Sequence, residues 1–196
     1  MGKGLYRGLA ALVVVVAACD PEPVPLTGHV SFGACVGRAG TCGGGDCCAT
    51  NDSITLLSED ALRAKCTLLA GSRESEIRVD LEIVSGDNKV GIRGDDLTFD
   101  NNPAAVVGLR ACDEFMVKVA GNEYPTTECG NVDVRTEFPP GGGCEIQMNL
   151  DTSEAIVGRF RCKELQLPSQ AQYFSTLYEG ELGWGEFRFE NCADRR

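Results

Sequence analysis

Apolar and polar residues alternate along most of the chain beyond about residue 28. The alternation is most regular in residues 76–84 (EIRVDLEIV), where Ile, Val and Leu take every second position. Successive side chains of a β-strand point to opposite faces of a sheet, so this pattern predicts a strand with one buried face. The same period recurs in HVSFG (29–33), SITLL (53–57), FMVKV (115–119), NVDVRTEF (131–138), EIQMNL (145–150) and GEFRFEN (185–191).

Clusters of Gly, Asp, Asn and Pro separate these runs. Several short strands divided by turn residues predict an all-β fold, an antiparallel β-sandwich or barrel-like sandwich. Helical spacing is sparse. It predicts at most one short helix, in residues 168–178, besides a single turn in residues 58–64.

Two alternating runs flank residues 151–154 and predict a hairpin. In the register that places Cys144 opposite Cys162, Ile146 faces Phe160, so both sulfurs share a face with apolar side chains. A two-residue turn would shift this register by one position, and a bulge or a longer loop is therefore required. Side chains opposite each other on paired strands approach the spacing that a disulfide needs. The hairpin thus predicts a Cys144–Cys162 disulfide.

The N-terminus has a different pattern. Lys3 and Arg7, with no acidic residue near them, precede the ten apolar residues 9–18, and the run ends at Cys19. A basic segment before an apolar run of this length is typical of an export signal peptide. Ten apolar residues are too few to span a bilayer as a helix.

The end of that run, Val16-Ala17-Ala18-Cys19, resembles the lipobox of bacterial lipoproteins, in which the chain is cut before the cysteine. The resemblance implies that residues 1–18 are a signal peptide and that Cys19 carries acyl chains. Residues 19–27 are then a lipidated, Pro-rich tether, and residues 28–196 one disulfide-stabilised β domain. The body is similar in general character to small Cys- and Gly-rich lipoproteins of the myxobacterial type. The implied location is the bacterial cell envelope, on the periplasmic or surface side of a membrane.

The cysteine count agrees with export. Of eleven cysteines, ten remain when Cys19 is set aside. In an oxidising compartment, cysteines pair and persist as disulfides. A second candidate pair, Cys112 with Cys129, spans a turn at 121–122. Pairing is left open for the remaining six: Cys35, Cys42, Cys47, Cys48, Cys66 and Cys192.

Four of these six lie in CVGRAGTCGGGDCC (35–48). Their spacing does not match the short Cys knuckles of structural zinc sites, so disulfides are the favoured interpretation and no metal is expected. Adjacent cysteines rarely bond each other. We therefore expect Cys47 and Cys48 to reach distant partners, with Cys66 and Cys192 as the first candidates.

Net charge excludes one class of partner. The formal charge of −11 becomes −13 when cleavage removes Lys3 and Arg7. Because such a surface repels phosphate backbones, no nucleic acid partner is expected. The expected partners are the membrane, through the N-terminal lipid, and an envelope protein or polysaccharide.

Candidate catalytic residues are few. The single histidine, His29, is expected at an outward position of the first strand, and no G-x-S-x-G motif accompanies it. A group of acids, Asp87, Asp95, Asp96 and Asp100, offers oxygen ligands for calcium but lacks the spacing of an EF-hand loop. No catalytic, cofactor-binding or metal-ligating residue is therefore assigned.

Aromatic residues gather near the C-terminus: Tyr173, Phe174, Tyr178, Trp184, Phe187 and Phe189. The two tyrosines and Trp184, if exposed, would form a platform for stacking sugars. Phe187 and Phe189, however, occupy alternate positions of a strand-like run, which favours a place in the core for these two residues.

The leading hypothesis is a lipid-anchored, non-enzymatic binding or structural module of the envelope. The alternatives are a secreted hydrolase using carboxylates or calcium, a carbohydrate-binding module, and a thiol-redox protein built on Cys47 and Cys48. A hydrolase predicts a pocket with two carboxylates of raised pKa. A redox protein predicts thiols that remain reduced after export.

Overall fold

A computed structural model describes residues 24–38, 50–70, 76–98, 107–108, 111–127, 129–130, 142–152, 155–167, 172–178 and 181–195. Within these residues the chain forms strands and one 3₁₀ turn, η1 (Ser58–Asp60), and no α-helix. The predicted all-β class is confirmed. The signal-peptide segment and Cys19 lie outside the described residues.

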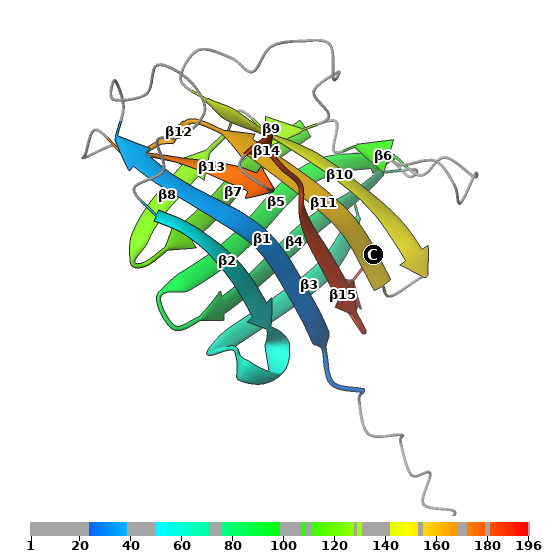
Figure 1. Cartoon of the computed structure of the whole chain (residues 1–196). Coiled ribbons are helices and arrows are strands. Elements are labelled where there is room, and N and C mark those ends of the chain that lie inside the picture. The colour runs from blue at the N-terminus through cyan, green and yellow to red at the C-terminus, as the bar shows by residue number, and fades with distance from the viewer. Residues whose placement is uncertain are drawn as a thin grey trace, which may run out of the picture.

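The strands form two sheets, one in front of the other (Figure 1). Sheet A has the order β12 (Leu165–Gln166), β13 (Gln172–Tyr178), β1 (Thr27–Arg38), β15 (Gly185–Glu190), β11 (Ala155–Lys163), β10 (Gly143–Thr152) and β6 (Val107–Gly108). Three more strands join it: β2 (Thr50–Leu57) on β1, β14 (Glu181–Leu182) on β13, and β9 (Cys129–Gly130) on β10. Sheet B has the order β16 (Ala193–Arg195), β3 (Arg63–Ala70), β4 (Glu76–Ser85), β5 (Asn88–Thr98), β7 (Ala111–Val119) and β8 (Asn122–Thr126).

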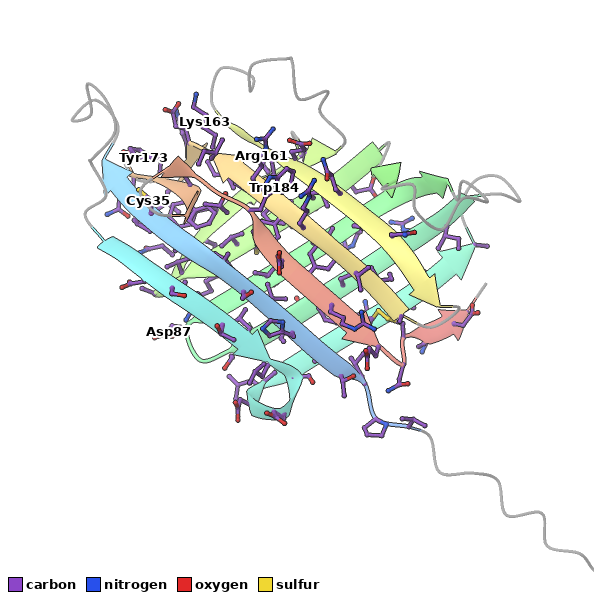
Figure 2. All side chains as sticks on the ribbon, turned by 45° about the vertical axis from the view of Figure 1, so that its right-hand side comes forward. Cys35, Asp87, Arg161, Lys163, Tyr173 and Trp184 are labelled. Atoms are coloured by element: carbon purple, nitrogen blue, oxygen red, sulfur yellow. A yellow bond between two sulfur atoms is a disulfide. The ribbon has the colours of Figure 1, made fainter. Side chains whose placement is uncertain are left out.

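The chain alternates between the sheets. It pairs β1 with β2 in sheet A, crosses through η1 to the β3–β4–β5 meander of sheet B, and returns to sheet A for the β10–β11 hairpin. Among the described strands, all pairings are antiparallel except β9 with β10 and β16 with β3. The long strands of sheet A run across those of sheet B (Figures 1 and 2). Two crossed layers are a known way to enclose a core between sheets.

The predicted alternation places the core between the sheets. Ile77, Val79, Leu81 and Ile83 of β4 are all buried. The alternate apolar residues of the other runs are buried as well: Val30 and Phe32 of β1, Ile54 and Leu56 of β2, Phe115, Val117 and Val119 of β7, and Phe187 and Phe189 of β15. Each buried side chain removes apolar area from water at about 25 cal/mol per Å², which stabilises the two layers together. Of the predicted runs, NVDVRTEF lies outside the described residues.

Phenylalanine rings fill the centre of the core. The centroid of the Phe160 ring lies 5.5 Å from that of Phe32, within sheet A, and 5.1 Å from that of Phe115 in sheet B. Gly185 makes room for them, since a Cβ there would lie 2.7 Å from atoms of both Phe32 and Phe160. The aromatic contacts thus join the sheets where the backbone of β15 lacks a side chain.

The predicted β10–β11 hairpin is confirmed in register and in its disulfide. Cys144 lies opposite Cys162, with a Cα–Cα distance of 4.1 Å, and the two sulfurs are bonded. The pairing shifts by one residue between Leu150 and Thr152, which is the irregularity that the register required.

One expectation about the other cysteines is wrong. Cys66 and Cys192 are bonded to each other rather than to Cys47 and Cys48, because β16 runs beside β3 and brings the two Cα atoms within 4.8 Å. Cys35 and Cys129 each take part in a further disulfide. Cys42, Cys47 and Cys48 lie outside the described residues, as does the side chain of Cys112, so the Cys112–Cys129 pair stays a prediction.

The predicted helix in residues 168–178 is also wrong. Gln172–Leu177 pair residue by residue with Gly33–Arg38 of β1, as strand β13. Helical spacing of three aromatic or small residues is a weak local signal, and pairing with a long neighbouring strand outweighs it. The turn expected in residues 58–64 is present as η1, a single 3₁₀ turn.

The disulfides place the folded domain in an oxidising compartment. In the part of the chain that the structure describes, no helix combines the length and the apolar character that crossing a bilayer demands.

Candidate binding site on the outer face of sheet A

Several residues considered from the sequence lie apart from one another. His29 is exposed on the outer face of β1, opposite Arg188 of β15, as its strand position predicted. Asp87 lies in the exposed β4–β5 turn, labelled in Figure 2. The side chains of Asp95 and Asp96 and the whole of Asp100 are outside the described residues. Among the described side chains, no group of three or more His, Cys, Asp or Glu has the arrangement of a metal site.

The hypothetical aromatic platform does not assemble as a set. Phe174, Phe187 and Phe189 are buried in the core, as the alternation favoured. Tyr173 and Trp184 are half-buried at the outer surface of sheet A, and the side chain of Tyr178 is not among those described. The Trp184 ring already contacts two guanidinium groups, so it is not an open stacking surface on that side.

A connected polar network lies beneath Trp184. The Glu145 side chain is 1% exposed, and one of its carboxylate oxygens, Oε2, accepts hydrogen bonds from Nε and Nη2 of Arg161, both at 2.7 Å. Its other oxygen accepts a hydrogen bond from Nε2 of Gln147 at 2.8 Å. Burial of a carboxylate is tolerated here because a cation and an amide satisfy it.

The network continues to Arg159. Its Nε donates to Oε1 of Gln147 at 2.7 Å, and its Cζ lies 4.3 Å from the centroid of the Trp184 ring. The Cζ of Arg161 lies 4.8 Å from the same centroid. Arg161 and Trp184 are labelled next to each other in Figure 2. Strand register explains the arrangement, since Arg159 pairs with Gln147 and Arg161 with Glu145 across the hairpin.

Sequence reasoning followed the inward positions of this hairpin and missed its outward ones. The alternation that places Ile146 and Phe160 in the core also places Glu145, Gln147, Arg159 and the remaining outward residues on one face. Opposite charges at paired positions were the available signal for a cross-strand network.

An open groove of about 610 Å³ adjoins the network on this face. It crosses β1, β15, β11 and β10, and its lining residues are His29, Gln147, Met148, Asn149, Val157, Gly158, Arg159, Glu186, Phe187 and Arg188. The polar groups that line it are two guanidiniums, an imidazole, two amides and one carboxylate. This set can donate hydrogen bonds to an anion and exchange hydrogen bonds with hydroxyl groups.

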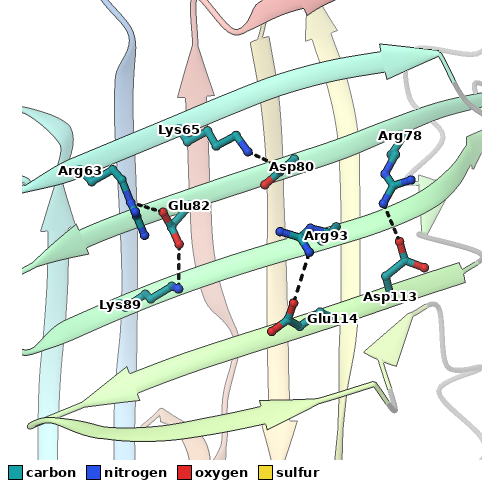
Figure 3. Close-up of polar contacts among 9 residues, drawn as sticks. All are labelled: Arg63, Lys65, Arg78, Asp80, Glu82, Lys89, Arg93, Asp113 and Glu114. Carbon is teal, nitrogen blue, oxygen red and sulfur yellow. Dashed lines mark hydrogen bonds and ion pairs between the residues drawn. The ribbon is translucent and has the colours of Figure 1, made fainter.

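The outer face of sheet B has another character, a set of closely paired charges (Figure 3). Oε1 of Glu82 lies 2.5 Å from Nε of Arg63, and Oε2 of Glu82 lies 2.7 Å from Nζ of Lys89. Three further pairs cross the strands: Lys65 with Asp80, Arg78 with Asp113, and Arg93 with Glu114. Here each carboxylate faces a cation of the same sheet.

Sheet B also has a cavity of about 50 Å³, which Asp80, Glu82 and Glu114 help to line. Burial pushes the pKa of Glu82 upward, but the hydrogen bonds and charges of Lys89 and Arg63 outweigh it and hold the pKa below the ordinary 4.5. A general acid of a glycoside hydrolase needs a raised pKa. Glu82 is therefore a structural ion-pair partner rather than a proton donor.

Comparisons of the chain with protein-family models, with curated proteins and with solved structures found no match. Function is therefore inferred from the geometry of the described residues and from the N-terminal motif.

Proposed function

We propose that the chain is a lipid-anchored module of the bacterial cell envelope that binds a polar envelope component and has no enzymatic activity. Its single supporting observation in the fold is the open groove on the outer face of sheet A, which lies over a filled core. The lipobox-like segment ending at Cys19 and the disulfides support the envelope location.

The groove favours binding over hydrolysis. Canonical glycoside hydrolysis uses two carboxyl groups on either side of the scissile bond, and the groove lining includes one carboxylate, Glu186. The paired carboxylates of sheet B are neutralised by cations, as Glu82 illustrates. Both observations support a binding role over a hydrolase.

The anchor is tested by mass spectrometry of the full chain expressed in a bacterium that processes lipoproteins. We expect a product that lacks residues 1–18 and carries acyl mass on Cys19, with no alkylatable thiol before reduction. The control is Cys19→Ser, which should carry no acyl mass. A mature N-terminus elsewhere, without acyl mass, would contradict the proposed anchor.

Binding is tested by adsorption of the processed protein, in detergent, to purified envelope polysaccharide and cell-wall material. We expect Arg159→Gln/Arg188→Gln to reduce adsorption at least tenfold, because charged hydrogen bonds contribute about 1.5 to 3 kcal/mol each. The matched control is Arg78→Gln/Arg93→Gln, which removes the same charge from the outer face of sheet B. Equal loss in both variants would show that the groove has no special role.

A further inference from the structure

We infer that the groove on the outer face of sheet A binds a carboxylated saccharide, and that the Arg159 guanidinium receives the carboxylate. This inference rests on the proposed binding function and names its ligand class. It follows from three features of the groove: a fixed guanidinium, an imbalance of charge, and neighbouring groups suited to hydroxyls.

Arg159 is held in one orientation before any ligand arrives. Its Nε is used by Gln147, and its planar group lies against Trp184. Gln147 is fixed in turn through Glu145, which is buried and bonded to Arg161. A guanidinium anchored through Nε keeps its two Nη groups for a planar, bidentate partner. The side-chain entropy lost on binding is therefore small, which favours affinity.

The charge of Arg159 has no carboxylate partner among the described residues. Glu186 lies directly opposite it in the β11–β15 register, yet the two side chains form no ion pair. Arg159 is exposed, unlike Arg161, whose charge is committed to Glu145. An exposed, oriented cation in a chain of net charge −11 is a local exception that complements an anionic group.

The rest of the groove suits the hydroxyl groups and ring faces of a sugar. Asn149 and Gln147 carry amides, and Glu186 is an exposed acceptor for hydroxyl hydrogens. Val157 gives the floor an apolar patch that the non-polar face of a sugar ring can cover.

Trp184 is the sole tryptophan of the chain and lies beside Arg159, so its fluorescence reports on the site. The processed full-length protein in detergent is titrated with tetragalacturonate. Parallel titrations use the neutral galactose tetramer and tetraglutamate, which separate the saccharide and carboxylate requirements. The variants are Arg159→Gln, Arg159→Lys and Arg188→Gln, with Arg93→Gln on the outer face of sheet B as the matched control.

We expect a saturable fluorescence change with tetragalacturonate and none with the other two probes. Arg159→Gln should weaken binding at least tenfold. Arg159→Lys should weaken it less, because lysine keeps the charge but lacks the two Nη donors of the guanidinium. The affinity of Arg93→Gln should stay within twofold of the wild type. Arg188 also lines the groove, although its Nε is paired with Glu190 at 2.6 Å. Arg188→Gln leaves the Trp184 contacts intact and should weaken binding less than Arg159→Gln. It covers the case in which Arg159→Gln does not fold.

Absence of a saturable response to tetragalacturonate, an equal response to tetraglutamate, or equal weakening by Arg93→Gln would overturn the inference. Failure of the inference is distinguishable from failure of the proposed function. If the protein still adsorbs to envelope material through Arg159 and Arg188, only the ligand class is wrong. If that adsorption is also lost, the binding function itself is refuted.

Discussion

The stability of the fold depends on Arg161 for as long as its buried partner, Glu145, carries a charge. Arg161→Met would leave the Glu145 carboxylate buried with only the Gln147 amide as a partner. Removing one member of a buried pair costs about 3 to 5 kcal/mol, because the remaining charge is uncompensated. We expect a loss of about 3 kcal/mol in the free energy of unfolding, measured with urea.

The double variant Glu145→Gln/Arg161→Met separates the two explanations for such a loss. A neutral amide at 145 needs no cation, so most of the lost stability should return. If the double variant were as unstable as Arg161→Met alone, the loss would come from contacts of Arg161 with Trp184 instead of the stranded charge.

Glu82 gives the protein an acid-sensitive contribution to stability. Its pKa is lower in the folded state than the ordinary 4.5, so the folded state favours the ionised carboxylate. That stabilisation is present above the unfolded pKa and is lost as the pH falls through the folded one. Between pH 6 and pH 3, the free energy of unfolding should therefore fall more in the wild type than in Glu82→Gln.

The control for this pH series is Glu59→Gln, which changes an exposed carboxylate of η1. It should lose stability on acidification as steeply as the wild type. If Glu82→Gln had the same slope as both, the ion pairs with Arg63 and Lys89 would contribute nothing to the acid response.

The packing of strand β15 against the phenylalanine rings of the core depends on the absence of a side chain at Gly185. A methyl group there would lie 2.7 Å from buried atoms of Phe32 and Phe160. These two rings pack against each other, and Phe160 also packs against Phe115, so neither ring has room to move aside. Overpacking of this kind destabilises by about 1 to 3 kcal/mol. We expect Gly185→Ala to lower the urea midpoint accordingly.

The matched substitution is Gly91→Ala in β5, where the nearest atom to a new Cβ is the flexible Lys89 side chain at 3.5 Å. It should be neutral or slightly stabilising, since alanine restricts the unfolded chain. An equal loss in both variants would mean that backbone preference, rather than the aromatic cluster, dictates glycine at 185.

Elements were predictable where their signals were local. The alternation of β4 predicted a strand and its buried face, and the alternating runs and cysteines of the β10–β11 hairpin predicted its register. Strand β13 was not predictable, because its pairing with β1 joins segments more than a hundred residues apart. The Arg159–Trp184 contact likewise depends on β15 lying beside β11, which no local pattern reveals.

The outer faces of the two sheets differ in how their charges are paired. Sheet B balances its charges internally through cross-strand pairs such as Arg93 with Glu114 (Figure 3). Sheet A buries one ion pair, Glu145 with Arg161, which holds the exposed Arg159 through Gln147. It also has an exposed pair, Arg188 with Glu190. Cross-strand pairing therefore neutralises the paired charges of sheet B, whereas on sheet A it orients Arg159 without a carboxylate partner among the described residues, which is the basis of the proposed binding face.

The position of the C-terminal strand β16 depends on a disulfide between residues that are far apart in the chain. Strand β16 has three residues, all exposed, so burial contributes little to its position beside β3. The Cys66–Cys192 disulfide spans 126 residues, whereas Cys144–Cys162 spans 18 within one hairpin. In the chain-entropy model, closing the longer loop contributes about 5 kcal/mol and closing the shorter one about 3 kcal/mol.

We therefore expect Cys66→Ala/Cys192→Ala to unfold at a lower urea concentration than Cys144→Ala/Cys162→Ala. Hydrogen exchange would locate the difference: the first variant should lose protection in β16 and β3 under native conditions, and the second around β10 and β11. Equal midpoints, with β16 still protected in the first variant, would show that strand pairing alone holds the C-terminus. Because both bridges border the core between the sheets, a larger effect of the longer one would identify chain topology, rather than local packing, as its source of stability.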